Sequence, residues 1–422
     1  MATMTGTAAS KRIITLDLIR GIAVMGIFSV NVVAFAMIEA AYLNPAGFGG
    51  STGENGFVWA ANMLLVDGKF RSLFSMLFGA SMLLVIDRAQ SAGRDGWSVH
   101  WRRMVVLLGL GSVHAFLIWH GDILTLYAMT GLVAFLFRKL AAEKLAALGI
   151  MFSLVNLLLF GAIALTLFGQ DVAVHGPHPS AEVIRNWDAN LSSFYPSAKA
   201  VAADMAIYDG GWAGIVAHEA RNAGQVLINN ILLMPDTLGL MLLGMAGYKS
   251  GFLAGEWSDD QYRRVAFWGI AAGLAGFGAL VVADFESGFY VPVVLGGFMA
   301  AMVPFRIAMA LGYAALIVLL FRKPSPLRAR FAAVGRAAFS NYIGTSLLAT
   351  AIFYGWGGGL YGDVSRAQAW LFVPLFWLLM LAWSKPWLDR FHYGPLEWLW
   401  RTLARGRAQP FRRKSRLAEA AA

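Results

Sequence analysis

Cysteine is absent from the 422-residue sequence, and charged residues are scarce. Without a thiol, the chain can form no disulfide, no cysteine nucleophile and no cysteine-ligated metal centre. Charged residues make up 14% of the chain, whereas soluble domains usually carry about 25%. Because 58% of the residues are hydrophobic and the mean hydropathy is +0.61, the composition excludes an ordinary soluble protein and predicts a polytopic membrane protein.

Two further signals are missing. Residues 1–10 are polar, and no short apolar run is followed by a small-residue cleavage site, so we expect the first span to remain in the protein. No P-loop pattern occurs, and no stretch is typical of a soluble catalytic domain. Any chemistry must therefore come from polar residues inside or beside the apolar segments.

Apolar stretches recur along the whole chain. A helix needs about 20 such residues to cross a bilayer, and ten stretches approach or exceed that length, which predicts an all-α, polytopic bundle of about ten transmembrane helices. The eighth stretch is too long for one crossing. Pro304 and Arg306 interrupt it, so we expect its first part to be a short interfacial or re-entrant piece. The ten stretches are 18–37, 72–86, 104–119, 123–137, 145–168, 226–248, 265–283, 291–321, 337–354 and 369–383.

Lysine and arginine are distributed unevenly between the connecting segments. With the N-terminus inside, the inner segments hold 26 of the 34 cations and the outer segments hold six, namely Lys69, Arg71, Arg185, Lys199, Arg221 and Arg366. This bias predicts that both termini lie in the cytoplasm. Since the net charge of +10 is divided among short loops, it favours contact with membrane lipids over nucleic acid.

The expected spans divide the chain into four parts. Residues 1–168 would form an N-terminal five-span bundle, and residues 226–404 a C-terminal five-span region. Between them, residues 169–225 would be extracytoplasmic, either as a helical lid over a site or as a passive connector. Residues 405–422 would form a basic cytoplasmic tail that contacts anionic lipid head groups.

Histidines in the expected outer segment could suggest a metal site. His175 and His178 flank Gly176–Pro177, which favours a turn rather than a shared helix face. Because these residues lack a typical metal-ligand spacing, we expect no metal here.

The first span contains polar residues that are costly in a membrane. Asp17 and Arg20 are three residues apart, so they share a helix face and can pair. Asn31 follows 11 residues later, about 16 Å further along the helix. The pair either anchors the inner end of the helix at the interface or shapes a polar site in which Asn31 is a second point.

A second polar stretch is HAFLIWHGDILTLY, from His114 to Tyr127. Imidazole moves protons readily near neutral pH, and a nearby carboxylate such as Asp122 could orient it. His114 lies about 11 residues above Arg103, which predicts the same depth as Asn31 above Arg20. Structural roles are equally open: His120 and Asp122 could cap the turn between two spans, and His114 could make an interhelical hydrogen bond.

These stretches resemble one family. The pattern R-x-x-x-L-D-x-x-R-G-x-A-x-x-G-I-x-x-x-N, read from Arg12 to Asn31, resembles the start of the YeiB-type family of bacterial inner-membrane proteins, which carries the domain of unknown function 418. The resemblance continues in LFSMLFG at 73–79, in the histidine-bearing stretch 102–128, in the segment 335–342 and in FHYGPLEWLW at 391–400. The matches therefore extend over nearly the full chain.

The first span is also similar, more distantly, to that of heparan-α-glucosaminide N-acetyltransferase. That enzyme moves acetyl from cytosolic acetyl-CoA to an amino sugar across the membrane, so the similarity implies a membrane-embedded acyltransferase with an acyl-CoA donor and a lipid or glycan acceptor. Its functional asparagine corresponds to Asn31. Its histidine has no counterpart before His100, so a histidine base in this chain must be His114 or His120.

Several arginines are expected to converge on the inner rim, which suits a phosphate-bearing donor such as acyl-CoA. Ordinary positive-inside anchoring would also explain them. The residues assigned to donor binding are Asp17, Arg20, Arg102, Arg103, Arg336 and Asn341, with Lys11 as a further cation.

Three functions remain in competition. In an acyltransferase, His114 or His120 would deprotonate the acceptor, Asp122 would orient the base, and Asn31 or Tyr127 would stabilise the oxyanion. In a transporter, the buried polar residues would line a route for a small molecule. The third possibility is a receptor or assembly partner without chemistry, and a homodimer is compatible with all three.

Overall fold

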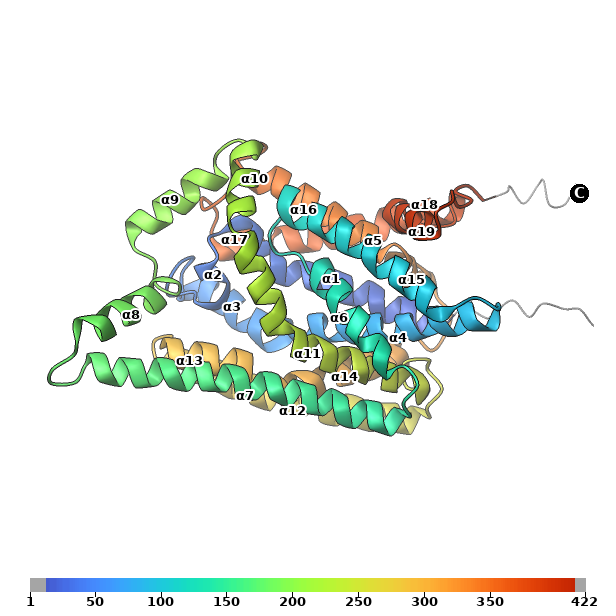
Figure 1. Ribbon diagram of the computed structural model, residues 1–422, viewed down its shortest axis with the longest axis horizontal. Coiled ribbons are helices and arrows are strands. Elements are labelled where there is room, and N and C mark those ends of the chain that lie inside the picture. The colour runs from blue at the N-terminus through green and yellow to red at the C-terminus, as the bar shows by residue number, and fades with distance from the viewer. Residues whose placement is uncertain (1–12, 414–422) are drawn as a thin grey trace, which may run out of the picture.

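The structure is a computed structural model that describes residues 13–413, so Lys11, Arg12 and the end of the basic tail lie outside the described residues. Helices make up 78% of it, and no β-sheet forms within the described range. The predicted all-α fold is confirmed (Figure 1). The helices are α1 (Ile14–Ala36), α2 (Ala40–Leu43), α3 (Gly53–Leu65), α4 (Lys69–Ser91), α5 (Gly96–Leu117), α6 (Leu124–Ala134), α7 (Ala142–Val174), α8 (Ala181–Ser192), α9 (Ala198–Tyr208), α10 (Trp212–Arg221), α11 (Ala223–Lys249), α12 (Asp259–Glu286), α13 (Val291–Leu295), α14 (Val303–Leu320), α15 (Pro326–Arg336), α16 (Ala338–Phe353), α17 (Arg366–Trp370), α18 (Phe372–Arg390) and α19 (Pro395–Arg405).

Seven helical segments of the described chain are long and apolar enough to cross a membrane, and three further apolar segments are shorter. The long ones include α1, α7, α11, α12 and α14, and two are formed by consecutive helices, α3 with α4 and α17 with α18. The predicted span at 104–119 lies in α5, which is not among them because its arginines and histidines lower its hydropathy. The protein is therefore a multi-pass membrane protein.

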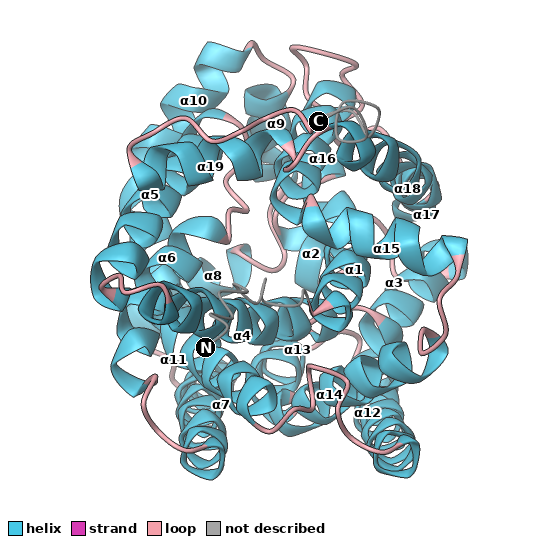
Figure 2. Ribbon diagram, turned by 90° about the vertical axis from the view of Figure 1, so that its right-hand side faces the viewer, coloured by secondary structure: helices cyan, strands magenta, loops and turns pink. Residues whose placement is uncertain are grey.

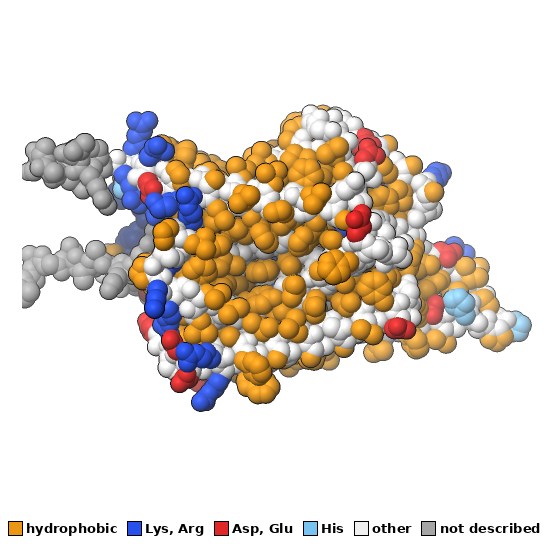
Figure 3. All heavy atoms as spheres, turned by 180° about the vertical axis from the view of Figure 1, so that it is seen from behind, with side chains coloured by type: hydrophobic (Ala, Val, Ile, Leu, Met, Phe, Trp, Pro, Cys, Tyr) orange, Lys and Arg blue, Asp and Glu red, His pale blue; other side chains and the backbone are white. Residues whose placement is uncertain are grey.

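The surface is apolar around the middle and charged at one end. Figure 3 shows lysine and arginine gathered at one end of the molecule, with a broad hydrophobic band beside them. We call this the basic end. The other end, called the far end, carries α8, α9 and α10 (Figure 1).

Helix α1 lies inside the bundle, where α4, α15 and α16 pack around it (Figure 2). Glycine permits the closest of these contacts. A Cβ at Gly335 in α15 would lie 1.8 Å from the carbonyl oxygen of Asp17, and one at Gly21 would lie 2.1 Å from the carbonyl oxygen of Phe331. The LDxxRG stretch and the segment 335–342, far apart in sequence, are thus in direct contact.

Two cations assigned to an outer loop lie within the bundle instead, Lys69 fully buried and Arg71 half-buried, so this part of the prediction was wrong. Lys69 and Arg71 belong to the first turn of α4, and Phe70 between them packs against Gly26 near the middle of α1. Lys69 is fully buried, donates to the carbonyl of Met63 and lies 2.9 Å from the centroid of the Phe277 ring. Protein groups, rather than water, satisfy these charges.

A helix that was not predicted, α3, precedes these residues and brings Met63 to Lys69. Arg366 is buried in a similar way, since its guanidinium donates to the carbonyl of Ala41 over 2.6 Å. Assigning lysine and arginine to loops by hydropathy places such cations outside the bundle, because hydropathy does not show which protein groups pair with them.

Residues 169–225 form a helical cover over the far end. Helices α8, α9 and α10 fold back on the bundle, where Trp212 donates to the carbonyl of Leu117 (2.8 Å) and Asn44 donates to the carbonyl of Phe194 (2.9 Å). Trp187 packs against Leu167. The segment thus contacts the ends of several bundle helices along its length.

The long stretch 291–321 is interrupted as predicted. Helix α13 passes into a π-helical turn (Gly296–Ala301), and α14 then begins with Pro304 in its first turn. Proline has no N–H and tolerates this position, whereas it would break a continuous helix.

The amphipathic helix α19 covers part of the basic end. Its Glu397 carboxylate accepts hydrogen bonds from the backbone N–H groups of Phe339 (2.7 Å) and Ser340 (3.2 Å) and from the Ser340 hydroxyl (2.6 Å). A carboxylate from a distant helix therefore caps the N-terminus of α16, where unpaired N–H groups favour negative charge.

Candidate functional site

His114 and Asp122 form a buried pair at the turn between α5 and α6. The Nδ1 atom of His114 lies 2.8 Å from Oδ1 of Asp122, and both side chains are at most 1% exposed. The second carboxylate oxygen of Asp122 accepts from the N–H (2.7 Å) and the hydroxyl (2.8 Å) of Thr125. Asp122 therefore caps the start of α6 and orients His114 at the same time.

The tautomer of the imidazole is assigned from its bond to Asp122. An ionised carboxylate can only accept, so Nδ1 of His114 carries the proton and donates it to Asp122. The other nitrogen, Nε2, is then a proton acceptor. It is buried and has no hydrogen-bond partner in the described structure. A buried basic nitrogen held in one orientation is the arrangement expected of a general base.

Aromatic rings surround His114. The Tyr342 ring centroid lies 5.2 Å from that of His114, and Trp119 lies edge-on at 6.2 Å. The Tyr342 hydroxyl donates to the carbonyl of Gly121 (3.2 Å), which links α16 to the turn that holds Asp122. Tyr342 was not predicted as a site residue, because nothing in the sequence places α16 beside α5.

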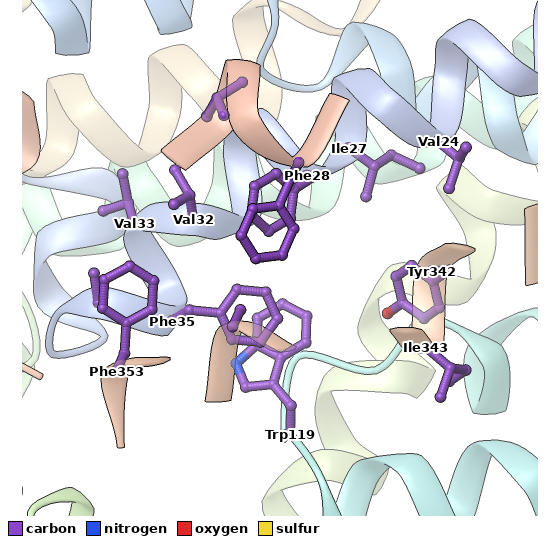
Figure 4. Close-up of a cluster of buried hydrophobic side chains, with 14 of the residues drawn as sticks. Val24, Ile27, Phe28, Val32, Val33, Phe35, Trp119, Tyr342, Ile343 and Phe353 are labelled. Carbon is purple, nitrogen blue, oxygen red and sulfur yellow. The ribbon is translucent and has the colours of Figure 1, made fainter. Parts of the chain in front are cut away.

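Asn31 lies on α1 and makes no hydrogen bond to the His114–Asp122 pair. It is half-buried, and within residues 13–413 its side chain has no hydrogen-bond partner. Phe35, one turn further along the same face, packs against Trp119 with ring centroids 4.0 Å apart (Figure 4). The structure thus brings the α1 face of Asn31 against the residues that surround His114.

Tyr127 is engaged elsewhere. Its hydroxyl lies 2.8 Å from the Ser75 hydroxyl, which donates to the carbonyl of Arg71, so Tyr127 is the donor to Ser75. The Tyr127 ring is fully buried against Phe74 and Phe78. Its proton is therefore already committed within the protein.

His120 belongs to a second polar group at the far end. Its Nδ1 lies 3.3 Å from the Glu219 carboxylate of α10, which also accepts from the Tyr208 hydroxyl over 2.8 Å. Burial lowers the pKa of His120, but the hydrogen bond and charge of Glu219 outweigh it and the pKa is raised overall. Burial raises the pKa of Glu219, but the hydrogen bond and charge of His120 outweigh burial, so the pKa is lowered overall. The two groups therefore favour the ion pair.

The far-end group also involves the helical cover. Asp204 in α9 accepts from the Tyr361 hydroxyl over 2.8 Å, and burial raises the pKa of this carboxyl group. A narrow pocket of about 10 Å³, roughly the space of one water molecule, lies beside Glu219 and Tyr354. Residues of the segment 169–225 thus complete a polar group that sequence spacing alone did not reveal.

Five of the six predicted donor residues form two separate groups, and Asn341 lies apart on α16. Arg20 donates to Asp17 (3.1 Å) and to the Ser81 hydroxyl (2.5 Å), and it lies 3.5 Å from the carbonyl of Gly335, next to Arg336. The Arg20 side chain keeps 23% of its surface accessible.

The second group lies on α5. Arg103 stacks over the Trp400 ring at 4.1 Å, and Arg102 is exposed. Asn341 is buried and fully occupied, since it donates to Val334 and Ser384 and accepts from Trp383. Its observed contacts hold α16 in place.

One buried group of charges was missed. Asp236 in α11 pairs with Arg71 over 2.5 Å and with Arg306 of α14, and its carboxylate is completely buried. Pro235 directly precedes it inside the helix. The sequence signal is a proline followed by an acid within one apolar stretch, together with Arg306 within another.

Comparison with known proteins decides the family. The profile described as "Protein of unknown function (DUF418)" matches residues 247–407. The chain is 31% identical over 421 residues to "Uncharacterized protein YeiB" of Escherichia coli (strain K12), which covers 95% of this chain and 98% of that protein. The chain belongs to the YeiB-type DUF418 family. The predicted family resemblance is thereby confirmed.

Other relatives match along the same length. "Uncharacterized protein YxaH" of Bacillus subtilis (strain 168) is 30% identical over 99% of this chain and 100% of its own. The "Uncharacterized 39.9 kDa protein in amylase 3'region" of Bacillus acidopullulyticus is 26% identical over 96% of each chain. No solved structure matches the chain significantly. The DUF418 match includes Tyr342 and Glu397, whereas the His114–Asp122 pair precedes it.

Proposed function

We propose that this DUF418 protein is a membrane-embedded acyltransferase in which His114 is the general base. One observation carries the proposal: Nε2 of His114 is buried and unpaired while Nδ1 is held by Asp122. A structural histidine usually pairs both ring nitrogens or exposes one to water. An unpaired acceptor in the bundle interior is suited to a substrate hydroxyl or amine.

The reaction follows from that nitrogen. Nε2 of His114 takes the proton of the acceptor O–H or N–H as the acceptor atom attacks the thioester carbonyl of an acyl-CoA. The oxyanion then collapses, the C–S bond breaks, and the CoA thiolate leaves and recovers the proton from His114. Asp122 stabilises the imidazolium between the two steps. Asn31, whose amide has no partner, is the proposed oxyanion donor, because the Tyr127 proton is committed to Ser75.

The proposed donor enters from the basic end, which the positive-inside rule assigns to the cytoplasm of the bacterial inner membrane. Arg20, with Arg336 beside it, would contact the donor phosphates. On α4, which is packed among other bundle helices, Ser81, Phe78, Phe74 and Arg71 all remain half-buried at helical spacing. This accessible stripe supports a route for the acyl group from Arg20 towards mid-depth.

The test uses purified protein, a labelled acyl-CoA and membrane lipid or glycan acceptors. His114→Ala and His114→Gln should lower transfer roughly 10²–10⁴-fold, as expected for loss of a general base. His178→Ala, which alters an exposed histidine, is the control and should leave transfer unchanged. Full activity of His114→Gln would show that His114 is structural and would transfer the role of base to His120.

Donor binding is tested separately. Arg20→Ala should weaken acyl-CoA binding roughly tenfold or more, since a hydrogen bond to a charged group contributes about 1.5–3 kcal/mol. Arg94→Ala removes an exposed cation of the same end and serves as the control. Absence of any affinity for acyl-CoA would reject the acyltransferase.

A transporter is the second candidate, and specific features favour it. The Arg71–Asp236–Arg306 group lies where α11 contains Pro235 and where α13 and α14 are interrupted. Interrupted helices that carry buried charges are typical of transport sites. For a transporter, Asp236→Asn should abolish substrate flux in proteoliposomes while His114→Gln preserves it, and the acyltransferase predicts that no such flux exists.

A further inference from the structure

A surface cavity opens between α15 and α18 at the basic end, and its lining includes neither His114 nor Arg20. Its volume is about 430 Å³. Arg330 holds the two helices together here, since it donates to the carbonyl of Leu381 over 3.1 Å. The cavity is lined by Pro326, Arg330, Lys385, Pro386, Asp389 and Arg390.

Positive charge dominates this cavity. Three of its six residues are cations, and the single carboxylate, Asp389, is already paired with Lys385 over 2.7 Å. Arg330 is bonded only to an uncharged carbonyl. The guanidinium of Arg390 has no hydrogen-bond partner among residues 13–413. Two arginine charges therefore converge on an open cavity without a compensating anion.

An apolar stripe continues from the cavity along α18. Leu371, Leu375, Leu378 and Leu379 are between 45% and 72% exposed, so they face the surrounding lipid. They recur at spacings of three and four residues and share the helix face of Lys385, about 14 residues from the first leucine. At 1.5 Å per residue the four leucines span about 12 Å, and Leu371 lies roughly 21 Å from Lys385, so an extended acyl chain held at the cavity would reach all four.

We propose that the cavity binds the head group of an anionic phospholipid, with an acyl chain lying along the leucine stripe of α18. Arg330 and Arg390 would contact the phosphate, because guanidinium groups match phosphate geometry. The adjoining stripe favours a lipid over a free anion, since free phosphate would gain nothing from exposed leucine. Basic pockets at the cytoplasmic ends of membrane helices commonly hold such head groups.

The experiment measures lipid binding to the full-length protein in detergent by native mass spectrometry and by thermal unfolding. Phosphatidylglycerol should bind and stabilise, whereas phosphatidylcholine with the same chains should not. Arg330→Gln/Arg390→Gln should weaken phosphatidylglycerol binding roughly tenfold or more. Arg94→Gln/Arg264→Gln removes the same charge from exposed positions at this end and should leave binding nearly unchanged.

Other outcomes overturn the proposal. An equal loss of phosphatidylglycerol binding in both double variants would show that general surface charge, rather than this cavity, causes the binding. Equal binding of phosphatidylcholine, or equal stabilisation by inorganic phosphate, would exclude a site for an anionic lipid. If the double variant fails to fold in detergent, Arg390→Gln alone decides, because that side chain holds no protein group in the described structure.

Discussion

Asp122 serves two neighbours with its two oxygens. One holds His114, and the other caps α6 through Thr125. The capping role and the catalytic role that the sequence left as alternatives are therefore compatible, because a carboxylate has enough acceptor sites for both.

Asp122→Asn separates these roles. The amide oxygen can still accept from Thr125, but an amide NH₂ facing Nδ1 would favour the other tautomer of His114 and place a proton on Nε2. We expect transfer to fall roughly 10²–10⁴-fold, as for removal of the base, with a small change in unfolding temperature. Retained activity at normal stability would contradict an orienting role. Asp188→Asn, an exposed change, is the control.

The His120–Glu219 pair gives the far end a pH-dependent stability. The raised pKa of His120 stabilises the fold below its ordinary value of 6.5, and this is lost as pH rises through the folded-state pKa. The lowered pKa of Glu219 stabilises above 4.5 and is lost as pH falls through its own folded-state value.

Both contributions are present between about pH 4.5 and 6.5. The difference in unfolding temperature between the wild type and His120→Gln should therefore be largest in that window and should shrink at higher pH. A difference that stays constant from pH 5 to about 9 would show that the pair does not titrate as stated.

Asp236 forms ion pairs with two arginines inside the bundle, so its loss should be severe. Asp236→Asn removes the ion-pair partner of both cations, and breaking such a buried pair typically costs about 3–5 kcal/mol. Denaturation in detergent should show a large fall in unfolding temperature. Replacing Arg71, Asp236 and Arg306 together by leucine should be less damaging than Asp236→Asn alone, and the reverse order would contradict this account.

Helix contacts at glycine determine how the two halves of the chain meet. Gly335→Ala would place a methyl group against the carbonyl oxygen of Asp17 and force α15 away from α1. We expect a loss of about 1–3 kcal/mol, as for overpacking, and a disturbed Arg20 group. Gly344→Ala is the matched control, since no atom lies near a Cβ there and alanine favours a helix. Similar stability of the two variants would argue against close packing at Gly335.

Hydropathy and residue spacing predicted the positions of the helices better than the contacts of their side chains. The stretches 226–248 and 337–354 nearly coincide with α11 and α16, because long apolar runs define helices in a membrane. Helix α3 was missed because residues 53–65 are short and follow a glycine-rich segment. Lys69 and Arg71 were misplaced because burial of a charge depends on partners from helices far away in sequence.

The same limit applies to the candidate site. The sequence placed His114 near Asp122 because they are eight residues apart and separated by a turn. It could not place Tyr342 or Glu219 beside these histidines, since no local pattern records which helices pack together. The predicted donor group was likewise divided by the fold, with Arg20 bound to Ser81 and Arg103 stacked on α19.

The whole molecule has one basic end, which predicts its orientation in the membrane. A reporter inserted at residue 178, between α7 and α8, should be active outside the cytoplasm, and one at residue 139 or at the C-terminus should be active inside. Fusions that express to equal levels provide the comparison. A cytoplasmic signal from residue 178 would invert the orientation and with it the proposed side of donor entry.

The cap that Glu397 provides for α16 has a consequence for the timing of biosynthesis. Glu397 is synthesised 57 residues after Ser340, so α16 leaves the ribosome before its acceptor exists. At 5–20 residues per second this delay lasts roughly 3–11 s. During that interval the first N–H groups of α16 lack their final partner, and only the docking of α19 completes them. Arrested nascent chains ending before residue 397 should therefore show a protease-sensitive start of α16, and chains long enough to expose α19 should not.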